Sequence, residues 1–251
     1  MEMTHRFFVR PESMVQGRVT FGAALAHQMR SVLRLCPGAI VFVLDDSGWE
    51  YEVELTHLQR DWASGRVCTQ RLMQTEPHLS LTLYQSVLRG DRFEWVVQKG
   101  TELGVSTFVP ILGRRTIATD VQRIEKKRPR WERIIREAAE QSRRGRLPCL
   151  AKPLSFSSAC QRGARNHDLS LIPWEEWTQD SLCGVLCALD PRPKTVALWI
   201  GPEGGFDPDE IALARRLGIR AVTLGPRILR AETAGLAAVA IVLSALGEMG
   251  G

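Results

Sequence analysis

The fold of this chain is decided by one stretch, which reads LWIGPEGGF over residues 198–206 and LGPRILRAET over residues 224–233. Two short apolar runs, Val196–Ile200 and Ala221–Leu224, each end in a glycine loop, and the segment Pro208–Leu217 between them has helical character. Strand, loop, helix and strand in this order form the βαβ pattern of a parallel sheet. Because ligands bind beyond the carboxyl ends of parallel strands, we expect both glycine loops to line a binding site.

The first loop does not have the composition of a phosphate-binding loop. The chain contains neither a G-x-x-x-x-G-K-[ST] nor a G-x-G-x-x-G motif, and Pro202 and Glu203 stand where a phosphate loop needs bare N–H groups. A neutral or cationic ligand with a ribose or a base suits it better. An ordinary tight turn explains this loop equally well, but the second loop favours a site because it concentrates two arginines, one acid and one hydroxyl.

Together the two loops resemble the signature of the RsmE family, bacterial methyltransferases of the SPOUT superfamily that act on N3 of a uridine in 16S ribosomal RNA. Four further blocks, over residues 5–9, 27–38, 96–110 and 137–148, are similar to the family in the same order. The resemblance therefore covers nearly the whole chain. One departure is Gly113-Arg114-Arg115, where the family often has an acid; we expect it to alter a subunit or RNA contact and to leave the cofactor site untouched.

This resemblance implies an α/β protein of two domains. Residues 1–75 would form a PUA-like small β-barrel that binds RNA, and residues 76–251 a SPOUT α/β methyltransferase domain. In the family the C-terminal helix threads back through the preceding loops to make a trefoil knot. The implied cofactor is S-adenosyl-L-methionine, and the implied partner is 16S rRNA or the small ribosomal subunit, with uracil-1498 as the family target.

Residue patterns agree with this division. In the N-terminal part, alternating residues predict a hairpin, a further strand at Arg66–Met73 and one helix at Gly22–Leu33. From Leu79 onward, strands alternate with helices, as in a parallel sheet. The predicted hairpin strands are Ala39–Leu44 and Trp49–Leu55, the later strands are Ser80–Gln85, Phe108–Ile111 and Leu169–Ile172, and the helices are Asp91–Leu103, Val121–Ser142 and Ala234–Leu246.

Methyl transfer to uracil N3 needs a group that takes up the N3 proton or cations that stabilise the resulting anion. On the resemblance, we expect Arg230 to stabilise negative charge and Glu232 or Glu203 to accept a proton or a hydrogen bond. The alternative is that Arg227, Arg230 and Glu232 form surface ion pairs of little energy. The resemblance also implies cofactor contacts, mostly through the backbone, from Leu171, Ile200, Gly201, Glu203, Gly204, Gly205, Leu224, Gly225, Ile228, Leu229 and Thr233.

A net charge of +5 suits a polyanionic partner, although many soluble enzymes share it. The predicted RNA-binding residues are Arg6, Arg10, Arg30, Arg34, Lys99, Arg143, Arg144 and Arg146. The basic run Arg123–Arg133 is open between an RNA contact and a solvated helix face. The six cysteines show no metal-binding spacing, and the N-terminus shows no apolar signal core, so we expect a cytoplasmic protein with no metal and no membrane partner.

Two other functions stay open at this point. A ribose 2′-O-methyltransferase of the same superfamily tends to carry an Asn and an Arg in the first block and a Ser–Asn pattern after the final loop, where this chain has Gln98-Lys99 and Thr233-Ala234-Gly235. A non-catalytic RNA-binding assembly factor is the other. We expect the protein to be a homodimer, because Ala234–Leu246 is apolar nearly all round and needs cover on more than one side.

Overall fold

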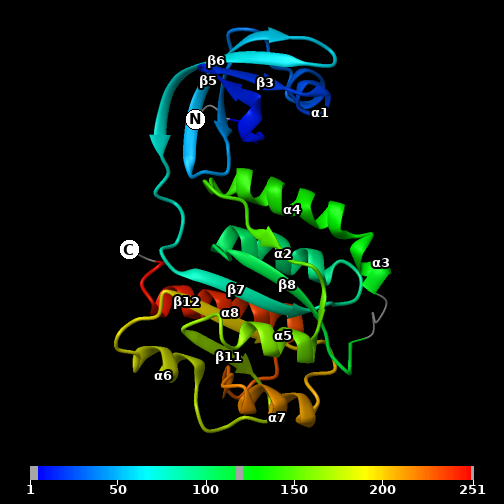
Figure 1. Cartoon of the computed structure of the whole chain (residues 1–251), viewed down its shortest axis with the longest axis vertical. Coiled ribbons are helices and arrows are strands. Elements are labelled where there is room, and N and C mark those ends of the chain that lie inside the picture. Colours follow the sequence, from blue (N-terminus) through cyan, green and yellow to red (C-terminus); the bar gives the residue numbers. More distant parts are fainter. Residues whose placement is uncertain (1–4, 117–120, 250–251) are drawn as a thin grey trace. The chain divides into compact units, whose positions relative to one another are not determined.

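The computed structural model describes residues 5–116 and 121–249, and the chain forms two compact units (Figure 1). The first unit takes in the chain up to Glu76 together with the segment Ala139–Leu147. The second unit consists of Pro77–Ala138 and Pro148–Gly251. By its contacts, Ala139–Leu147 therefore belongs with the N-terminal part of the chain, although it comes more than sixty residues after Glu76 in sequence.

The first unit is built on a six-stranded sheet with the order β1-β4-β5-β6-β3-β2. All neighbouring strands are antiparallel except β1 and β4, which are parallel. The predicted hairpin is confirmed, because residues 40–44 pair with residues 50–54. The strands are β1 (Arg6–Phe8), β2 (Met14–Val15), β3 (Arg18–Phe21), β4 (Ile40–Leu44), β5 (Trp49–Leu58) and β6 (Ala63–Leu72).

The helix predicted at Gly22–Leu33 forms, but in two parts. An α-helical turn, α1 (Ala23–His27), runs into a π-helical turn, η2 (Gln28–Val32), and a short 3-10 turn, η1 (Pro11–Ser13), precedes β2. Ala26 and Met29 are fully buried and pack on the apolar face of the sheet. The hydrophobic core of the first unit therefore lies between this helix and the strands.

The second unit is built on a seven-stranded, wholly parallel sheet. Its strand order is β10-β8-β7-β12-β11-β13, and β9 pairs with β8. The predicted strands at the two glycine loops are confirmed as β12 and β13, with β11 between them. The strands are β7 (Ser80–Ser86), β8 (Thr107–Leu112), β9 (Cys149–Leu150), β10 (Leu154–Ser155), β11 (Leu169–Pro173), β12 (Thr195–Ile200) and β13 (Arg220–Val222).

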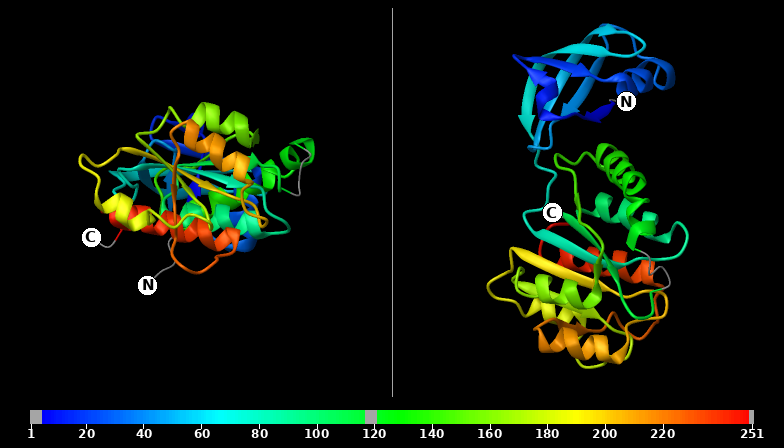
Figure 2. Two further views of the ribbon diagram at one scale, coloured as in Figure 1. Left: turned by 90° about the horizontal axis from the view of Figure 1, so that it is seen from below. Right: turned by 45° about the vertical axis from the view of Figure 1, so that its right-hand side comes forward.

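Helices cover both faces of this sheet (Figure 2). On one face α8 packs against α2 and α6, and on the other face α5 packs against α7. Both faces of β12 are thereby covered, and Trp199 near its carboxyl end is fully buried and stacks on Tyr84 of β7. The helices are α2 (Arg92–Leu103), α5 (Phe156–Gly163), α6 (Leu182–Cys187), α7 (Pro208–Arg216) and α8 (Ala231–Ala245).

The prediction of a single helix at Val121–Ser142 is wrong. The structure has two helices, α3 (Val121–Glu125) and α4 (Arg128–Gln141), separated at Lys126 and Lys127. Pro129 explains the break, because proline has no N–H to donate and its ring collides with the carbonyl four residues earlier. In the first turn of α4 those losses cost little, so the new helix begins just before the proline.

Four helices end in the same way. A residue in the left-handed conformation follows the helix, and the N–H of the next residue donates to the carbonyl five residues before it. Gly104, Gly218 and Gly247 take this place after α2, α7 and α8, with φ of 115°, 90° and 85°. After α4 the residue is Arg143, with φ of 59°, and Arg144 N–H donates to the Ala139 carbonyl at 2.9 Å. An arginine thus stands where the other three helices have glycine.

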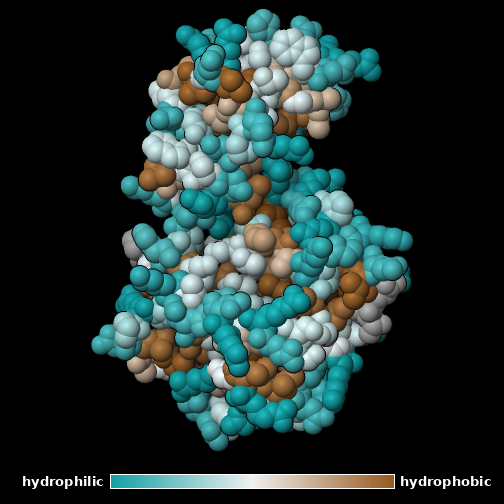
Figure 3. Space-filling view, viewed as in Figure 1, coloured by the Kyte–Doolittle hydropathy of each residue, from teal (hydrophilic) through white to brown (hydrophobic). Residues whose placement is uncertain are grey.

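The surface is mostly hydrophilic, with apolar side chains in separate patches on the face shown in Figure 3. Of the helices in the described ranges, none combines the length and apolar character needed to cross a membrane. Within the described part of the second unit, the two most exposed large apolar side chains are Ile228, at 87%, and Trp95, at 51%. Ile228 lies in the second glycine loop, and Trp95 lies on α2.

Candidate active site

A cavity of about 380 Å³ lies beyond the carboxyl ends of β11, β12 and β13, next to the first turn of α8. Sites for small molecules have volumes of about 300–1,000 Å³. Both predicted glycine loops line the cavity, at the sheet edge where parallel sheets bind ligands. The lining comes from residues 173–175, 200–206 and 223–234, without Gly204, Pro226 and Thr233, and from Arg92 of α2.

The structure brings eight of the eleven predicted cofactor residues to this cavity. Two glycine loops that are twenty residues apart in sequence meet there, because β12 and β13 flank β11 in one parallel sheet. The eight residues are Ile200, Gly201, Glu203, Gly205, Leu224, Gly225, Ile228 and Leu229.

The other three predicted cofactor residues lie outside the lining. Leu171 is fully buried in the core between the sheet and its helices, and β11 reaches the cavity only at its end, through Pro173 and the following Trp174. Thr233 is exposed on α8. Gly204 is exposed at the outer side of its turn, where its carbonyl accepts a hydrogen bond from Arg115. A site beyond strand ends is lined by the residues that follow the strands.

Two glycines of the lining have positive φ and differ in what a side chain at their position would meet. At Gly225, with φ of 106°, no described atom lies within 4 Å of the place of a Cβ, so a side chain there would point into open space. At Gly205, with φ of 70°, a Cβ would collide with the carboxylate of Glu175. Glycine at Gly205 thus makes room for Glu175, and glycine at Gly225 leaves the space beside the loop open.

Glu203 is anchored to the start of α2. Its Oε1 accepts a hydrogen bond from the Arg89 N–H at 2.9 Å and lies 3.4 Å from Nη1 of Arg92. The side chain of Glu203 is 21% exposed. An acid whose oxygen is already held by a backbone donor and a guanidinium is better suited to fixing the loop than to accepting a proton. Arg92 was not predicted; the signal was its place just after β7, whose end lies beside that of β12.

Glu232 is less exposed than Glu203, at 14% of its side chain against 21%. Its Oε1 lies 3.9 Å from Nε of Arg92, whereas its Oε2 is buried and has no hydrogen-bond partner among the described residues. Buried polar atoms are nearly always hydrogen-bonded, so Oε2 of Glu232 is an acceptor that lacks a donor in this structure. Both acids line the cavity, and both lie against Arg92.

The alternative of surface ion pairs among the arginines of the second loop is not what the structure shows. Arg227 and Arg230 line the cavity, are exposed and form no ion pair within residues 5–116 and 121–249. Glu232 faces Arg92 instead. The lining thus carries three arginines and three glutamates, and two of the arginines are free to meet negative charge on a ligand.

Two of the predicted RNA-binding arginines are parts of the first unit's interior. Arg6 is 8% exposed at its side chain, and its Nε donates to Oε1 of the buried Glu50 at 2.9 Å. Arg144 is 5% exposed and its Nη2 lies 2.7 Å from Oε2 of Glu76. Buried pairs of this kind hold a fold together and leave no charge for a phosphate. The exposed members of the predicted set are Arg10, Arg30, Arg34, Arg143 and Arg146.

The basic helix of the second unit has acidic partners. Arg128 lies 2.8 Å from Glu132, and Arg130 lies 2.7 Å from Glu94 of α2. Lys99, a predicted RNA contact, lies 2.7 Å from Glu102 and 5.1 Å from the centre of the Trp95 ring. The structure therefore gives these cations roles within the unit, which favours a solvated helix face for α4.

The cysteines form no site. Five of them are exposed and free, and burial raises the pKa of the sixth thiol, Cys160, to about 12, with the Glu210 carboxylate acting in the same direction. No group of three or more His, Cys, Asp or Glu side chains suited to a metal ion is found among the residues that the structure describes.

Comparisons with known proteins agree with the geometry. Residues 75–243 match the RNA methyltransferase domain family. Ribosomal RNA small subunit methyltransferase E of Synechocystis is 36% identical over 95% of this chain and 77% of its own length, and that of Bacillus subtilis is 32% identical over 86% of each. The structure of this methyltransferase from Neisseria gonorrhoeae bound to S-adenosyl methionine superposes with a TM-score of 0.85 at 29% identity, over 96% of this chain and 97% of that one.

Proposed function

We propose, since the chain belongs to the family of ribosomal RNA small subunit methyltransferase E, that it transfers the methyl group of S-adenosylmethionine to N3 of a uridine in 16S rRNA, with uracil-1498 as the target. One observation carries this proposal: the two glycine loops of the family signature meet at one cavity that is also lined by Glu232 and by two arginines without an ion pair among the described residues. The proposal places the transfer in that cavity.

The residues of the cavity fit S-adenosylmethionine. No described atom lies within 4 Å of the place of a Cβ at Gly225, so a larger residue would fill space that is open. The cavity volume suits a molecule of nucleoside size. When bound, the cofactor supplies an electrophilic methyl group on a positively charged sulfur. Glu175, Glu203 and Glu232 provide negative charge for such a cation, and the backbone of residues 201–205 and 223–225 provides donors and acceptors for its ribose and base.

We assign the proton and charge steps to Glu232 and Arg230. The Glu232 carboxylate takes the N3 proton of uracil, and Arg230 stabilises the negative charge that spreads to the uracil oxygens. N3 then bonds to the methyl carbon as the carbon–sulfur bond breaks. Glu203 holds the loop against α2 through Arg89 and Arg92 and takes no proton.

A matched pair of variants separates the two acids. Glu232→Gln keeps the shape of the side chain but removes its basicity, and we expect a loss of about 10²–10⁴-fold in the rate of methyl transfer. Glu203→Gln still offers an oxygen to the Arg89 N–H, so its rate should stay within about tenfold of the wild type. Equal losses in both variants, measured in single-turnover reactions, would contradict the assignment.

RNA contacts are proposed for the exposed arginines of the first unit, whose fold we propose to be a PUA-like barrel. Arg10, Arg30, Arg34, Arg143 and Arg146 offer charge to phosphates, whereas Arg6 and Arg144 are excluded because their own side chains are buried against Glu50 and Glu76. Phosphate contacts make affinity salt-dependent and carry little sequence information. We therefore expect the exposed arginines to hold the RNA and the cavity residues to select the uridine.

A homodimer is proposed from the outward face of α8. Leu236, Ala237, Ala240 and Ile241 on that face stay partly exposed although α2 and α6 flank the helix. Trp95 on the neighbouring α2 is 51% exposed. Such an apolar surface is typical of a two-fold interface, and the partner subunit would complete the cavity for RNA. Light scattering at micromolar concentration should give twice the chain mass.

A knot in the second unit is also proposed. After the edge strand β13 the chain returns to α8, which packs over the central β12 between α2 and α6. The loops after β11, β12 and β13 surround the start of that helix at the cavity. This course supports a helix that passes through the preceding loops, as in the family. The same family membership supports the expected cytoplasmic location.

Mass spectrometry of nucleosides tests the proposed function. Undermethylated 16S rRNA or small subunits, incubated with the protein and S-adenosylmethionine, should yield 3-methyluridine, and digestion to oligonucleotides should locate it. A 2′-O-methylated nucleoside would assign the protein to the ribose-modifying branch of the superfamily. No methylated nucleoside at all, with both substrates, would favour an assembly factor.

A further inference from the structure

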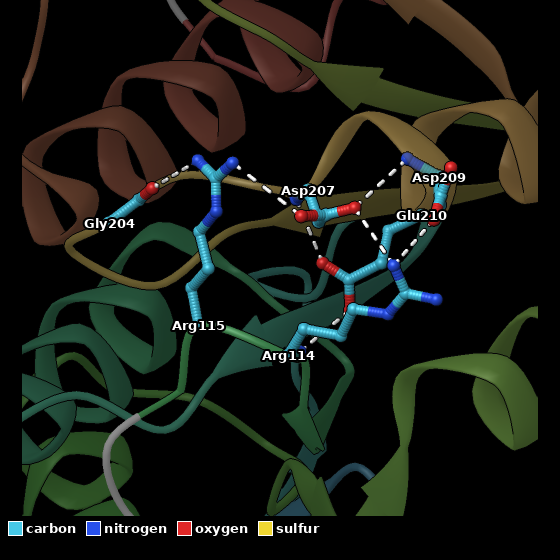
Figure 4. A network of polar contacts seen from close by, with 6 residues as sticks. All are labelled: Arg114, Arg115, Gly204, Asp207, Asp209 and Glu210. Atoms are coloured by element: carbon cyan, nitrogen blue, oxygen red, sulfur yellow. Dashed lines mark hydrogen bonds and ion pairs between the residues drawn. The ribbon is translucent and has the colours of Figure 1, made fainter.

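The turn after β8 holds the first glycine loop from outside the cavity. Residues 113–116 form a tight turn in which Thr116 N–H donates to the Gly113 carbonyl at 3.1 Å and Gly113 N–H donates to Oγ1 of Thr116 at 2.9 Å. Thr116 is 4% exposed. This turn directs Arg114 and Arg115 toward residues 204–210 (Figure 4). Gly113-Arg114-Arg115, which we expected to leave the cofactor site untouched, thus contacts the first glycine loop and the start of α7 at residues outside the cavity lining.

Arg114 fastens the start of α7. Its Nη1 lies 3.1 Å from Oδ1 of Asp207 and 2.6 Å from Oδ2 of Asp209, and its N–H donates to Oε1 of Glu210 at 2.9 Å. Asp207 caps α7 and forms a capping box with Glu210. These acids are favourable at the N-terminus of the helix, so Arg114 acts on α7 and touches no residue of the cavity lining.

Arg115 acts on the glycine loop itself. Its Nη1 donates to the Gly204 carbonyl at 3.0 Å, and its Nη2 lies 3.6 Å from Oδ2 of Asp207. The stem of the side chain lies against Gly204, where a Cβ would stand 3.4 Å from Cβ of Arg115. Gly204 was predicted to touch the cofactor; in the structure its carbonyl faces Arg115 instead.

The contact of Arg115 reaches the cavity through one peptide group. The Gly204 carbonyl and the Gly205 N–H belong to the same planar unit, and the Gly205 N–H donates to the Pro202 carbonyl at 3.0 Å. Both ends of this peptide are therefore held, one by Arg115 and one by the turn. Gly205, which has φ of 70°, lines the cavity, so the orientation of the peptide sets the cavity wall at that point.

We propose that Arg115 is a positioning residue for the cofactor, which keeps the Gly204–Gly205 peptide in its binding orientation before S-adenosylmethionine arrives. Two consecutive glycines have the widest backbone freedom of any pair, and ordering them at the moment of binding would weaken affinity. A guanidinium donor to a carbonyl is charge-assisted and stronger than a neutral hydrogen bond. This inference goes beyond the proposed function, because it concerns cofactor binding in the absence of RNA.

The test compares two neighbouring arginines. Arg115→Ala should weaken the binding of S-adenosylmethionine and of its demethylated product by about 3- to 10-fold in calorimetry without RNA, which corresponds to about 0.6–1.4 kcal/mol. In the methylation assay KM for S-adenosylmethionine should rise by the same factor while kcat stays within about twofold. Arg114→Ala, the matched control, should keep cofactor affinity within about twofold, because Arg114 makes no contact with Gly204.

Arg115→Lys, which keeps a cationic donor on a flexible stem, should recover at least half of the lost affinity, counted as free energy. The proposal is overturned if Arg115→Ala binds the cofactor as the wild type does, or if Arg114→Ala weakens binding as much as Arg115→Ala. In the second case the effect would come from the start of α7 and not from the Gly204 carbonyl. Neither result depends on which nucleoside the enzyme methylates, so the proposed function stands or falls separately.

Discussion

Arg143→Gly should make the protein more stable and its binding to RNA weaker. Arg143 is exposed and has φ of 59° at the end of α4, the position at which α2, α7 and α8 carry glycine. Its carbonyl accepts a hydrogen bond from Oγ1 of Thr75 at 2.7 Å, a contact that glycine keeps. The substitution therefore removes backbone strain and the guanidinium without removing the bonds that end the helix.

The magnitude follows from two opposing terms. The left-handed conformation costs a residue with a Cβ about 1–2 kcal/mol, and glycine does not have this cost. Glycine has a larger loss of backbone entropy on folding, which offsets about 0.5–1 kcal/mol of that gain. The expected net change is about 1 kcal/mol in favour of the folded state, or about 2–4 °C in Tm for a protein of this size.

Arg143→Ala is the matched control, because it removes the same guanidinium but keeps the Cβ and the strain. Its stability should stay within about 0.5 kcal/mol of the wild type. In fluorescence anisotropy with a labelled 16S rRNA fragment, both variants should bind more weakly, with the slope of log K against log salt reduced by about 1. The reasoning is refuted if Arg143→Gly unfolds at lower denaturant than Arg143→Ala. Unchanged RNA affinity in both variants would remove Arg143 from the RNA contact.

Four further outcomes follow from the same contacts. Gly225→Val should abolish cofactor binding in calorimetry while circular dichroism stays native, since the branched side chain enters the open space of the cavity; retained affinity would place the cofactor elsewhere. Arg230→Ala should lose most methyl transfer and keep cofactor affinity within about threefold, because its charge is needed only as the uracil anion develops; parallel loss of both would make it a loop residue. Arg144→Ala should cost about 3 kcal/mol of the free energy of unfolding by leaving Glu76 without its buried partner, as denaturant titration can show; a change near zero would contradict the interior role. Native protein at pH 8 should react with iodoacetamide at the five exposed cysteines and spare Cys160, whose thiol pKa of about 12 keeps it protonated; peptide mapping that finds Cys160 alkylated as fast as the others would contradict its burial.

Local signals were sufficient for much of the second unit. The end of α2 followed from Gly104, which the structure finds in the left-handed conformation, and the strand at Val196–Ile200 followed from an unbroken apolar run that both faces of the sheet require. The glycine loops followed from composition and position. In each case neighbours in sequence are also the neighbours that decide the conformation.

The failures have a common physical cause. The amphipathic pattern of Val121–Ser142 outweighed Pro129, although the proline was a local sign of a break. From the sequence, Arg6 and Arg144 were predicted to be free charges, because no residue near them in the chain indicates that they pair with Glu50 and Glu76. Arg115 read as remote from the cofactor loop, from which it is separated by nearly ninety residues.

By itself, the sequence determined the order of the strands and helices, the position of the two glycine loops and the acids and arginines available to a site, because these depend on residues close together in the chain. Only the tertiary structure decided which of the charges are free. Arg230 keeps a guanidinium without an ion pair among the described residues, whereas Arg6 and Arg144 are held by partners brought from distant segments. The reason is that a charge is available to a ligand only when folding has placed no opposite charge or backbone donor against it, and the contacts that settle this form between segments whose separation in sequence gives no sign of their meeting.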